Sequence, residues 1–418
     1  MKRKLVIPLI ILFLSVVMSG CGTETEAKSN LHIAKDVAFG KQDYETIMTP
    51  NNDLGFKILT EVDADDNDNR FISPTSLMMA LGMVYNGADG ETKDEIAETL
   101  QAEGIDIEDM NQANASLMTM LDRDMSDIQL DVANSIWLAD GFHFNDDFSK
   151  NTQDYFNAEL QEVDMLDSET PKMINDWVDE QTNGTIEEIV DDSLSPNTVA
   201  MLINAIYFKG DWTHTFEEGL TEDHAFHLED GSTEDIPLMS LTEKLYYLET
   251  DTFQAVALPY GDGEMNMHVF LPKEDTDLAS FQEELTSDNW ESWQSDFEKT
   301  EGTIMLPKFE LEYEANLVEP LTALGMEAAF DAEDASFPNM IEEDQQIFIS
   351  DIKQKTFLDI HEEGTEASAA TNVQMEMTSA PIDQNEPFHM EVNRPFFMTI
   401  TDSETGAILF MGLIKQPS

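Results

Sequence analysis

The chain has 418 residues, 41% of them hydrophobic, which is enough to bury a large core in one or two domains. It carries 86 Asp and Glu against 21 Lys and Arg, a formal net charge of −65. A surface of this charge repels a phosphate backbone, so we expect no nucleic-acid partner. Our preferred explanation of the charge is a strongly solvated surface suited to high salt or an extracellular setting, rather than cation binding.

The first twenty residues differ in composition from the rest of the chain. A basic start at residues 2–4 precedes the apolar run "LVIPLIILFLSVVM" and the small residues before Cys21. The run is shorter than the roughly 20 apolar residues that span a bilayer. The pattern therefore predicts an export signal over residues 1–20. Cys21 is the single cysteine of the chain, so no disulfide forms within it.

The residues "MSGC" at 18–21 resemble the lipobox of bacterial lipoproteins, in which the cysteine is lipidated and becomes the mature N-terminus. The resemblance implies a lipid on Cys21 and a location on the outer face of the bacterial cell membrane. Residues 21–43 would then form an acidic tether. Met18 is a less usual residue at its position, so ordinary secretion remains the alternative.

Helices come early in the chain and strands come late. Apolar spacing predicts a helix over 44–60, and Ser73 followed by Pro74 predicts a capped helix that ends near Gly87. Further helices are expected at 171–183 and 317–324, and strands at 130–140, 198–212, 245–250, 253–260, 265–272, 303–314, 395–400 and 407–414. No Pro- or Ser-rich linker divides residues 50–418, which favours a single α+β domain.

No pattern typical of an enzyme is present. The sequence has no GxSxG elbow, HExxH pair, Walker loop or dinucleotide fingerprint. His224 and His227 lack a third ligand for a metal. The acidic loop at 63–69 fits a calcium loop poorly, because Asp68 stands where the turn glycine belongs and Pro74 where the distal glutamate belongs. We expect neither catalysis nor a metal or other cofactor.

The stretch "EEGTEASAATNVQMEMTSAP" at 362–381 has the alternation of a strand but no obvious partner. Between residues 365 and 376, odd positions are small or apolar and every charge falls on an even position, as in a strand with one buried face. The run "ASAA" at 367–370 is a poor strand former, which favours a segment that becomes a strand only after a conformational change. An ordinary half-buried strand is the alternative.

The same stretch resembles the hinge of inhibitory serpins, which reads acid, acid, glycine, threonine and then small residues. Six further segments resemble serpins in the same order: "FISPTSL" (71–77), "INDWVDEQTNGTI" (174–186), "LINAIYFKGDW" (202–212), "LPKFELEYEANLVEPLTALGM" (306–326), "MEVNRPFFMTI" (390–400) and "LFMGLI" (409–414). The chain is therefore identified as a member of this family over residues 44–418. The matching hinge residues are Glu362, Glu363, Gly364, Thr365, Glu366, Ala367, Ser368, Ala369, Ala370 and Thr371.

The resemblance implies an α+β serpin fold of about nine helices around three β-sheets, with an exposed reactive-centre loop at about 362–390. It implies a monomer that inhibits a serine protease in a covalent complex. The protease cleaves the loop as an acyl-enzyme, and the cleaved loop then enters the central sheet as an extra strand. A non-inhibitory serpin that acts as a binding or chaperone module is the alternative, and a solute-binding lipoprotein is a more distant one.

Serpins usually place the residue before the cleaved bond fourteen positions after the hinge glycine. Counted from Gly364, this predicts cleavage at Thr378–Ser379, with Met377–Thr378 as the next candidate. Residues 365–393 contain no Lys or Arg, so a trypsin-like protease has no side chain to bind. We expect a target of the subtilisin, elastase or chymotrypsin type.

Five other positions match serpin positions where the central sheet opens. Ser73, Ser76 and Asn204 match the region beneath the opening sheet. Gln354 falls where many serpins have a histidine, and its amide would not titrate. Trp212 matches a residue near the point where insertion begins. For each position an ordinary core or helix-cap role is the alternative.

Overall fold

The computed structural model describes residues 33–35, 37–123, 125, 127–365 and 386–417. Cys21, the hinge residues 366–371 and the candidate bond residues Met377, Thr378 and Ser379 lie outside these ranges. Within the ranges, no helix combines the length and the apolar character needed to cross a membrane.

Nine α-helices form in this part of the chain. Ser73 caps the second helix as predicted, because its side chain accepts a 3.2 Å hydrogen bond from the backbone N–H of Ser76. Asn183 and Gly184 follow the sixth helix with φ of 55° and 85°, which ends it as the sequence predicts. The helices are α1 (Glu45–Glu61), α2 (Pro74–Gly87), α3 (Gly90–Thr99), α4 (Ile107–Leu121), α5 (Asp146–Phe156), α6 (Thr170–Gln181), α7 (Leu278–Gln282), α8 (Ser287–Asp296) and α9 (Val318–Ala323).

Every predicted strand segment contains a strand, and the segment predicted at 303–314 is divided into two strands at Lys308. The strands at 159–163, 222–227, 349–360 and 388–391 were not predicted. The strands are β1 (Arg70–Ile72), β2 (Ile128–Ala139), β3 (Glu159–Val163), β4 (Ala200–Asp211), β5 (Glu222–His227), β6 (Thr233–Glu249), β7 (Phe253–Tyr260), β8 (Met265–Pro272), β9 (Glu298–Pro307), β10 (Phe309–Asn316), β11 (Ile349–Ile360), β12 (Gly364–Thr365), β13 (Phe388–Glu391), β14 (Phe396–Asp402) and β15 (Ile408–Ile414). One sheet has the order β10-β11-β12-β4-β2-β3. The other has the order β1-β15-β14-β8-β7-β6-β9-β13, with β5 on β6.

Hydrogen bonding thus joins the described strands into two sheets, where the resemblance implied three. The reason is the length of β6, which has 17 residues. β6 pairs with β5 near its start, with β9 through its middle and with β7 at its end. Two of the implied sheets therefore run together along this one strand.

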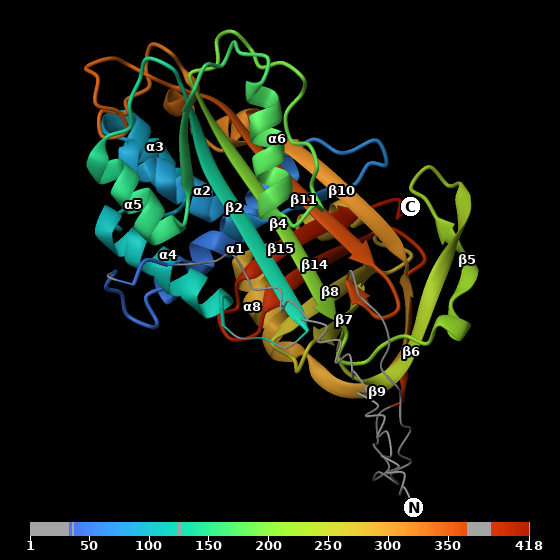
Figure 1. The fold of residues 1–418 in the computed structure, drawn as a ribbon. Helices are drawn as coiled ribbons and strands as arrows, with labels where there is room; N and C mark the ends of the chain where they lie inside the picture. Colours follow the sequence, from blue (N-terminus) through green and yellow to red (C-terminus); the bar gives the residue numbers. More distant parts are fainter. Residues whose placement is uncertain (1–32, 36, 124, 126, 366–385, 418) are drawn as a thin grey trace, which may run out of the picture.

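Apolar residues cover both faces of the six-stranded sheet. Leu202 and Ile206 of β4 belong to the main core, on the face where α2 packs. Met201 and Ile203 point the other way and form a smaller cluster with Val178 of α6. Figure 1 shows α6 lying across this second face. Because both faces are covered, β4 has the nearly continuous apolar sequence from which it was predicted.

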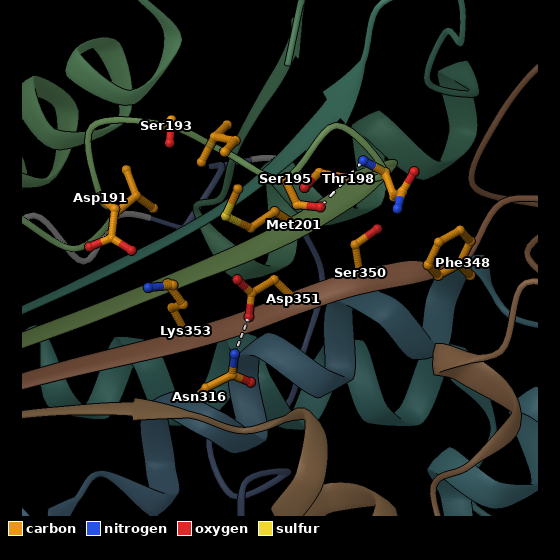
Figure 2. A pocket seen from close by; sticks show the side chains of 13 residues that line it. Asp191, Ser193, Ser195, Thr198, Met201, Asn316, Phe348, Ser350, Asp351 and Lys353 are labelled. Atoms are coloured by element: carbon orange, nitrogen blue, oxygen red, sulfur yellow. Dashed lines mark hydrogen bonds between the residues drawn. The ribbon is translucent and has the colours of Figure 1, made fainter. Parts of the chain in front are cut away.

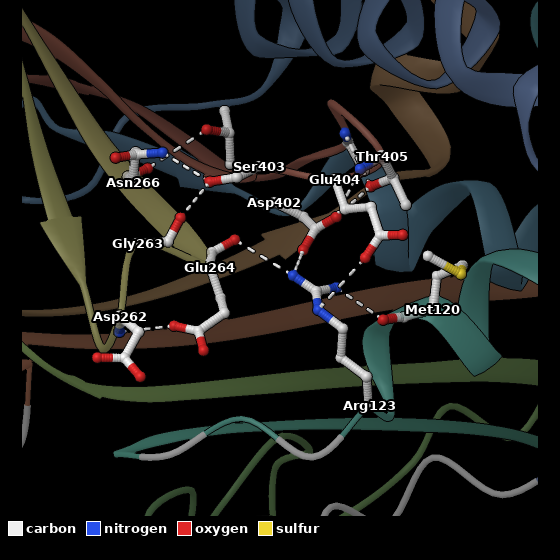
Figure 3. Close-up of polar contacts among 12 residues, drawn as sticks. Met120, Arg123, Asp262, Gly263, Glu264, Asn266, Asp402, Ser403, Glu404 and Thr405 are labelled. Atoms are coloured by element: carbon white, nitrogen blue, oxygen red, sulfur yellow. Dashed lines mark hydrogen bonds and ion pairs between the residues drawn. The ribbon is translucent and has the colours of Figure 1, made fainter.

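Arg123 joins α4 to two turns of the nine-stranded sheet (Figure 3). Its guanidinium donates to the carbonyl oxygens of Met120 at 2.7 Å and of Glu264 at 3.2 Å. It also forms an ion pair with Asp402, whose side chain is fully buried, and lies 3.9 Å from a carboxylate oxygen of Glu404. One cation therefore holds the end of a helix against the β7–β8 and β14–β15 turns.

Candidate functional site

The feature that corresponds to the predicted insertion path is the boundary between β4 and β11, which we call the β4–β11 seam. Residues Ile349–Phe357 of β11 pair in parallel with Ala200–Tyr207 of β4. Beyond this ladder, β12 lies between the same two strands and is antiparallel to both. The seam is therefore closed over most of its length and is entered at one end by the first residues of the loop.

Thr365 occupies the centre of that entrance. It is opposite Ile360 of β11 and Gly210 of β4. Its side chain is fully buried, and its hydroxyl lies 2.7 Å from the hydroxyl of Tyr260. Thr365 is the first residue of the odd-numbered set in the loop, and it faces the core.

Gly364 is required by its close approach to β4. A Cβ atom at this position would lie 2.2 Å from the carbonyl oxygen of Gly210 and 2.6 Å from the Cα of Asp211. Both contacts are with backbone, which has little freedom to move aside. Glycine at this position therefore lets β12 fit beside β4.

Trp212 holds the short connection between β11 and β12. Its ring is stacked on Tyr260, with centroids 4.2 Å apart. The indole N–H donates to the carbonyl oxygen of His361 at 2.9 Å, and the backbone N–H donates to that of Glu363 at 2.9 Å. The residue predicted to lie near the start of insertion thus contacts the first residues of the loop directly.

Glu362 is the second polar anchor of this connection. Its carboxylate accepts hydrogen bonds from Lys308 Nζ and from the hydroxyl of Thr221, each at 2.8 Å. Its carbonyl oxygen accepts one from the backbone N–H of Phe216. Burial by itself would raise the pKa of Glu362, but the hydrogen bonds from Lys308 and Thr221 outweigh it, so the pKa lies below the usual value.

Four of the five predicted sheet-opening residues form one buried network in the middle of the seam. Gln354 and Asn204 are directly opposite each other across the seam, and the amide of Gln354 donates to Asn204 Oδ1 at 2.8 Å. Gln354 also accepts from the backbone N–H of Ser73 at 2.9 Å and donates to its carbonyl oxygen at 3.0 Å. Asn204 donates to the hydroxyl of Ser76. Opening the seam breaks this network.

Asn134 of β2 is a further member of the network that the sequence reasoning did not select. It lies opposite Asn204 on β4, and its Oδ1 accepts from the Asn204 amide at 2.7 Å. Asn134, Asn204 and Gln354 therefore form a polar row across three adjacent strands. The signal was present as a lone asparagine within the apolar segment "LDVANSIWLAD". Trp212, by contrast, lies at the entrance and not in this row.

A cavity of about 400 Å³ lies at the far end of the seam (Figure 2). Its lining includes Asp351 and Lys353 of β11 and Met201 of β4. Here the register of the seam shifts between Ile349 and Asp351. Burial raises the pKa of Asp351, whose carboxylate accepts a 2.7 Å hydrogen bond from Asn316. No sequence pattern indicated this cavity.

Neither of the weak metal motifs gathers ligands in the structure. No group of three His, Cys, Asp or Glu side chains is placed to hold a metal ion within the described ranges. His224 lies 3.4 Å from a carboxylate oxygen of Glu391. In the acidic loop, Asp65 accepts hydrogen bonds from the backbone N–H groups of Asn67 and Asn69 at 2.8 and 2.7 Å, so its side chain stabilises the turn.

A closed central seam with Gly364 and Thr365 buried at one end is consistent with the serpin fold that the resemblance implies. The model of the family described as "Serpin (serine protease inhibitor)" matches residues 49–417. The chain belongs to the serpin family. Serpins are in general protease inhibitors rather than enzymes.

Relatives and solved structures agree with this assignment. An uncharacterised serpin-like protein of Thermococcus kodakarensis is 33% identical over 368 residues, covering 88% of this chain and 84% of the relative. Serpin B6 of Macaca fascicularis is 33% identical, and the match covers 89% of this chain and the whole of the relative. The native state of the thermophilic serpin tengpin superposes with a TM-score of 0.82 at 29% identity, covering 93% of this chain and 97% of tengpin. Human thyroxine-binding globulin, solved with its ligand, superposes with a TM-score of 0.79 at 25% identity, covering 90% of this chain and all of the globulin.

Proposed function

We propose that this protein inhibits serine endopeptidases by the suicide mechanism of inhibitory serpins. The serine hydroxyl of the protease attacks the carbonyl carbon of Thr378. The peptide bond to Ser379 breaks, its nitrogen takes up a proton, and an ester joins Thr378 to the protease. Insertion of the loop into the β4–β11 seam then carries the protease away before water hydrolyses the ester.

The observation that carries this proposal is the position of β12 between β4 and β11. If the loop continues in the same antiparallel register, each further loop residue lies opposite the β4 residue that is one position earlier in the chain. Thr371 would then arrive between Asn204 and Gln354, at the polar row. Its hydroxyl can donate and accept there, so the hydrogen bonds lost when the seam opens have a replacement.

The alternation of the loop supports a net gain on insertion. Odd-numbered residues would follow Thr365 toward the core, and burial of Val373 and Met375 would contribute roughly 1.5–3 kcal/mol each. The added ladder hydrogen bonds would contribute about 0.5–1.5 kcal/mol each. Glu366 and Glu376 fall in the even-numbered set, so neither charge would enter the core.

The composition of the loop favours proteases that accept small or apolar side chains. Residues 365–393 contain no Lys or Arg, so we propose a subtilisin-, elastase- or chymotrypsin-like target. We also propose that a lipid on Cys21 holds the inhibitor, as a monomer, at the outer face of the bacterial cell membrane.

The test is incubation of the protein with subtilisin, elastase, chymotrypsin and trypsin. We expect a complex that survives denaturing electrophoresis with at least one of the first three and none with trypsin. Mass spectrometry of the released C-terminal fragment should place its first residue at Ser379, or at Thr378 if the neighbouring bond is used. Cleavage without a stable complex in every case would favour a non-inhibitory binding or chaperone module.

Thr365→Arg is the matched variant for the insertion step. It places a charge at a position that is fully buried beside Tyr260. We expect this variant to be cleaved at the same bond but to release the protease. A complex formed as efficiently as by the wild type would contradict insertion in this register.

A further inference from the structure

A second cavity, of about 530 Å³, lies on one face of the nine-stranded sheet, over β6, β7 and β8. We call it the β6–β8 cavity. Helix α8 covers this face over β8, where His268 packs against Trp290 and Phe297. The helix leaves β6 open, so that Tyr246 remains 52% exposed. The cavity occupies the space between the helix and this tyrosine.

The floor of the cavity lies close to the backbone of the sheet because Ala257 and Pro259 have small side chains. Pairing places Tyr246 opposite Ala257, and Ala257 opposite His268, so these three side chains share one face in a row. The methyl group of Ala257 therefore lies between two large rings. Pro259, two residues further along β7, extends the same floor.

The charge of the lining has the opposite sign to that of the whole protein. Lys244 and Lys299 line the cavity, with His214 and a single carboxylate, Asp262. Burial lowers the pKa of His268 to about 4, so this imidazole is neutral at pH 7 and the lysines supply the charge. The chain as a whole has about four acidic residues for each basic one, since it carries 86 against 21.

Two other cavities do not share this property. The cavity at the end of the β4–β11 seam is lined by Asp191 and Asp351 against Lys353. A cavity at residues 334–346 has four carboxylates and no basic residue in its lining. A positive lining is therefore a local property of the β6–β8 cavity and does not follow from the composition.

Lys299 is placed to act together with an aromatic surface. It lies directly opposite Tyr246 across the β6–β9 pairing. Its ammonium nitrogen is 5.8 Å from the centroid of the tyrosine ring. An acid group that approaches the tyrosine ring would thus meet the ammonium group of Lys299.

We propose that the β6–β8 cavity binds a small organic anion with one carboxylate or sulfonate group on a flat apolar body. The acid group would meet Lys299 and Lys244, and the body would lie over Ala257 and Pro259 beside Tyr246. The volume falls within the range of about 300–1,000 Å³ that is common for small-molecule sites. This inference is independent of the proposed inhibitory function, because none of its residues belongs to the loop or the seam.

The test compares two dyes of nearly the same shape by isothermal titration with the full chain. One is 8-anilino-1-naphthalenesulfonate and the other is N-phenyl-1-naphthylamine, which lacks the acid group. We expect one site for the sulfonate, at least about tenfold weaker binding of the neutral dye, and weaker sulfonate binding as salt is raised. Equal affinity for the two dyes, or several equivalent sites, would overturn the proposal.

Three variants locate the binding. Lys299→Met should weaken sulfonate binding about tenfold or more, and Ala257→Leu should abolish it by filling the floor. Lys93→Met is the matched control, because Lys93 also lies over a tyrosine ring, 5.1 Å from the centroid of Tyr85, outside the cavity. We expect no change there. If circular dichroism shows that Ala257→Leu does not fold, the test depends on the surface variant Lys299→Met. Unchanged sulfonate binding by Lys299→Met would refute the site.

Discussion

Glu362 and Lys308 form an ion pair of 2.8 Å that ties the first residues of the predicted loop to the junction between β9 and β10. Glu362 is 6% exposed, whereas the Lys308 side chain remains 45% exposed. The pair therefore stabilises the connection that positions β12 at the entrance of the seam. Its strength depends on the ionisation of Glu362.

Glu362→Gln should lower the free energy of unfolding at pH 7 by about 1–3 kcal/mol, measured by urea denaturation. The pKa of Glu362 is lower in the folded protein than the usual value of 4.5. Its contribution is therefore complete above about pH 4.5 and is lost as the pH falls through the folded value. The difference from the wild type should shrink under acid. Glu363→Gln is the control, and an equal effect of both changes would contradict this role of Glu362.

Gly364→Ala should displace β12, because the new methyl group would meet the backbone of Gly210 and Asp211. We expect faster hydrogen exchange of the Thr365 amide and a loss of stability of about 1–3 kcal/mol. Gly219→Ala is the matched control, since a Cβ atom there has no neighbour within 4 Å and φ is not positive. Unchanged exchange at Thr365 in Gly364→Ala would show that the strand tolerates the crowding.

Gln354→His should make the free energy of unfolding depend on pH below about 6.5, a range in which the amide of Gln354 does not titrate. Burial lowers the pKa of a histidine, so the unfolded chain would bind the extra proton first as the pH falls below about 6.5. The variant should then lose up to about 1.4 kcal/mol per pH unit relative to the wild type. Thermal unfolding of the variant and the wild type from pH 8 to pH 5.5 measures the difference in stability. The contribution of His268 cancels, because both proteins contain it. A constant difference would contradict the prediction.

Arg123→Met should destabilise the protein by about 2–4 kcal/mol, because it leaves the buried carboxylate of Asp402 without its cation. The measurement is the urea midpoint at pH 7. Lys172→Met removes an exposed ion pair with Asp176 on α6, and we expect less than about 0.5 kcal/mol from it. Equal effects of the two changes would mean that the Arg123 network adds little to stability.

Much of the fold was predictable because its signals are local. The cap at Ser73, the apolar segments of β4, β14 and β15, and the turn at Asn183 each depend on neighbouring residues. The boundary at Lys308 was missed because β9 and β10 follow one another with a single residue between them. The merging of two expected sheets along β6 depends on pairing, which periodicity does not specify.

The sequence by itself determined the hinge pattern, the alternation of the loop and its lack of basic residues, because these are properties of one contiguous segment. Only the tertiary structure decided that the seam is closed, that Asn134 joins the polar row and that Lys308 pairs with Glu362. The contact between Gln354 and Ser73 joins residues 281 positions apart. Such contacts depend on how distant strands and helices pack, and no local spacing of side chains encodes them.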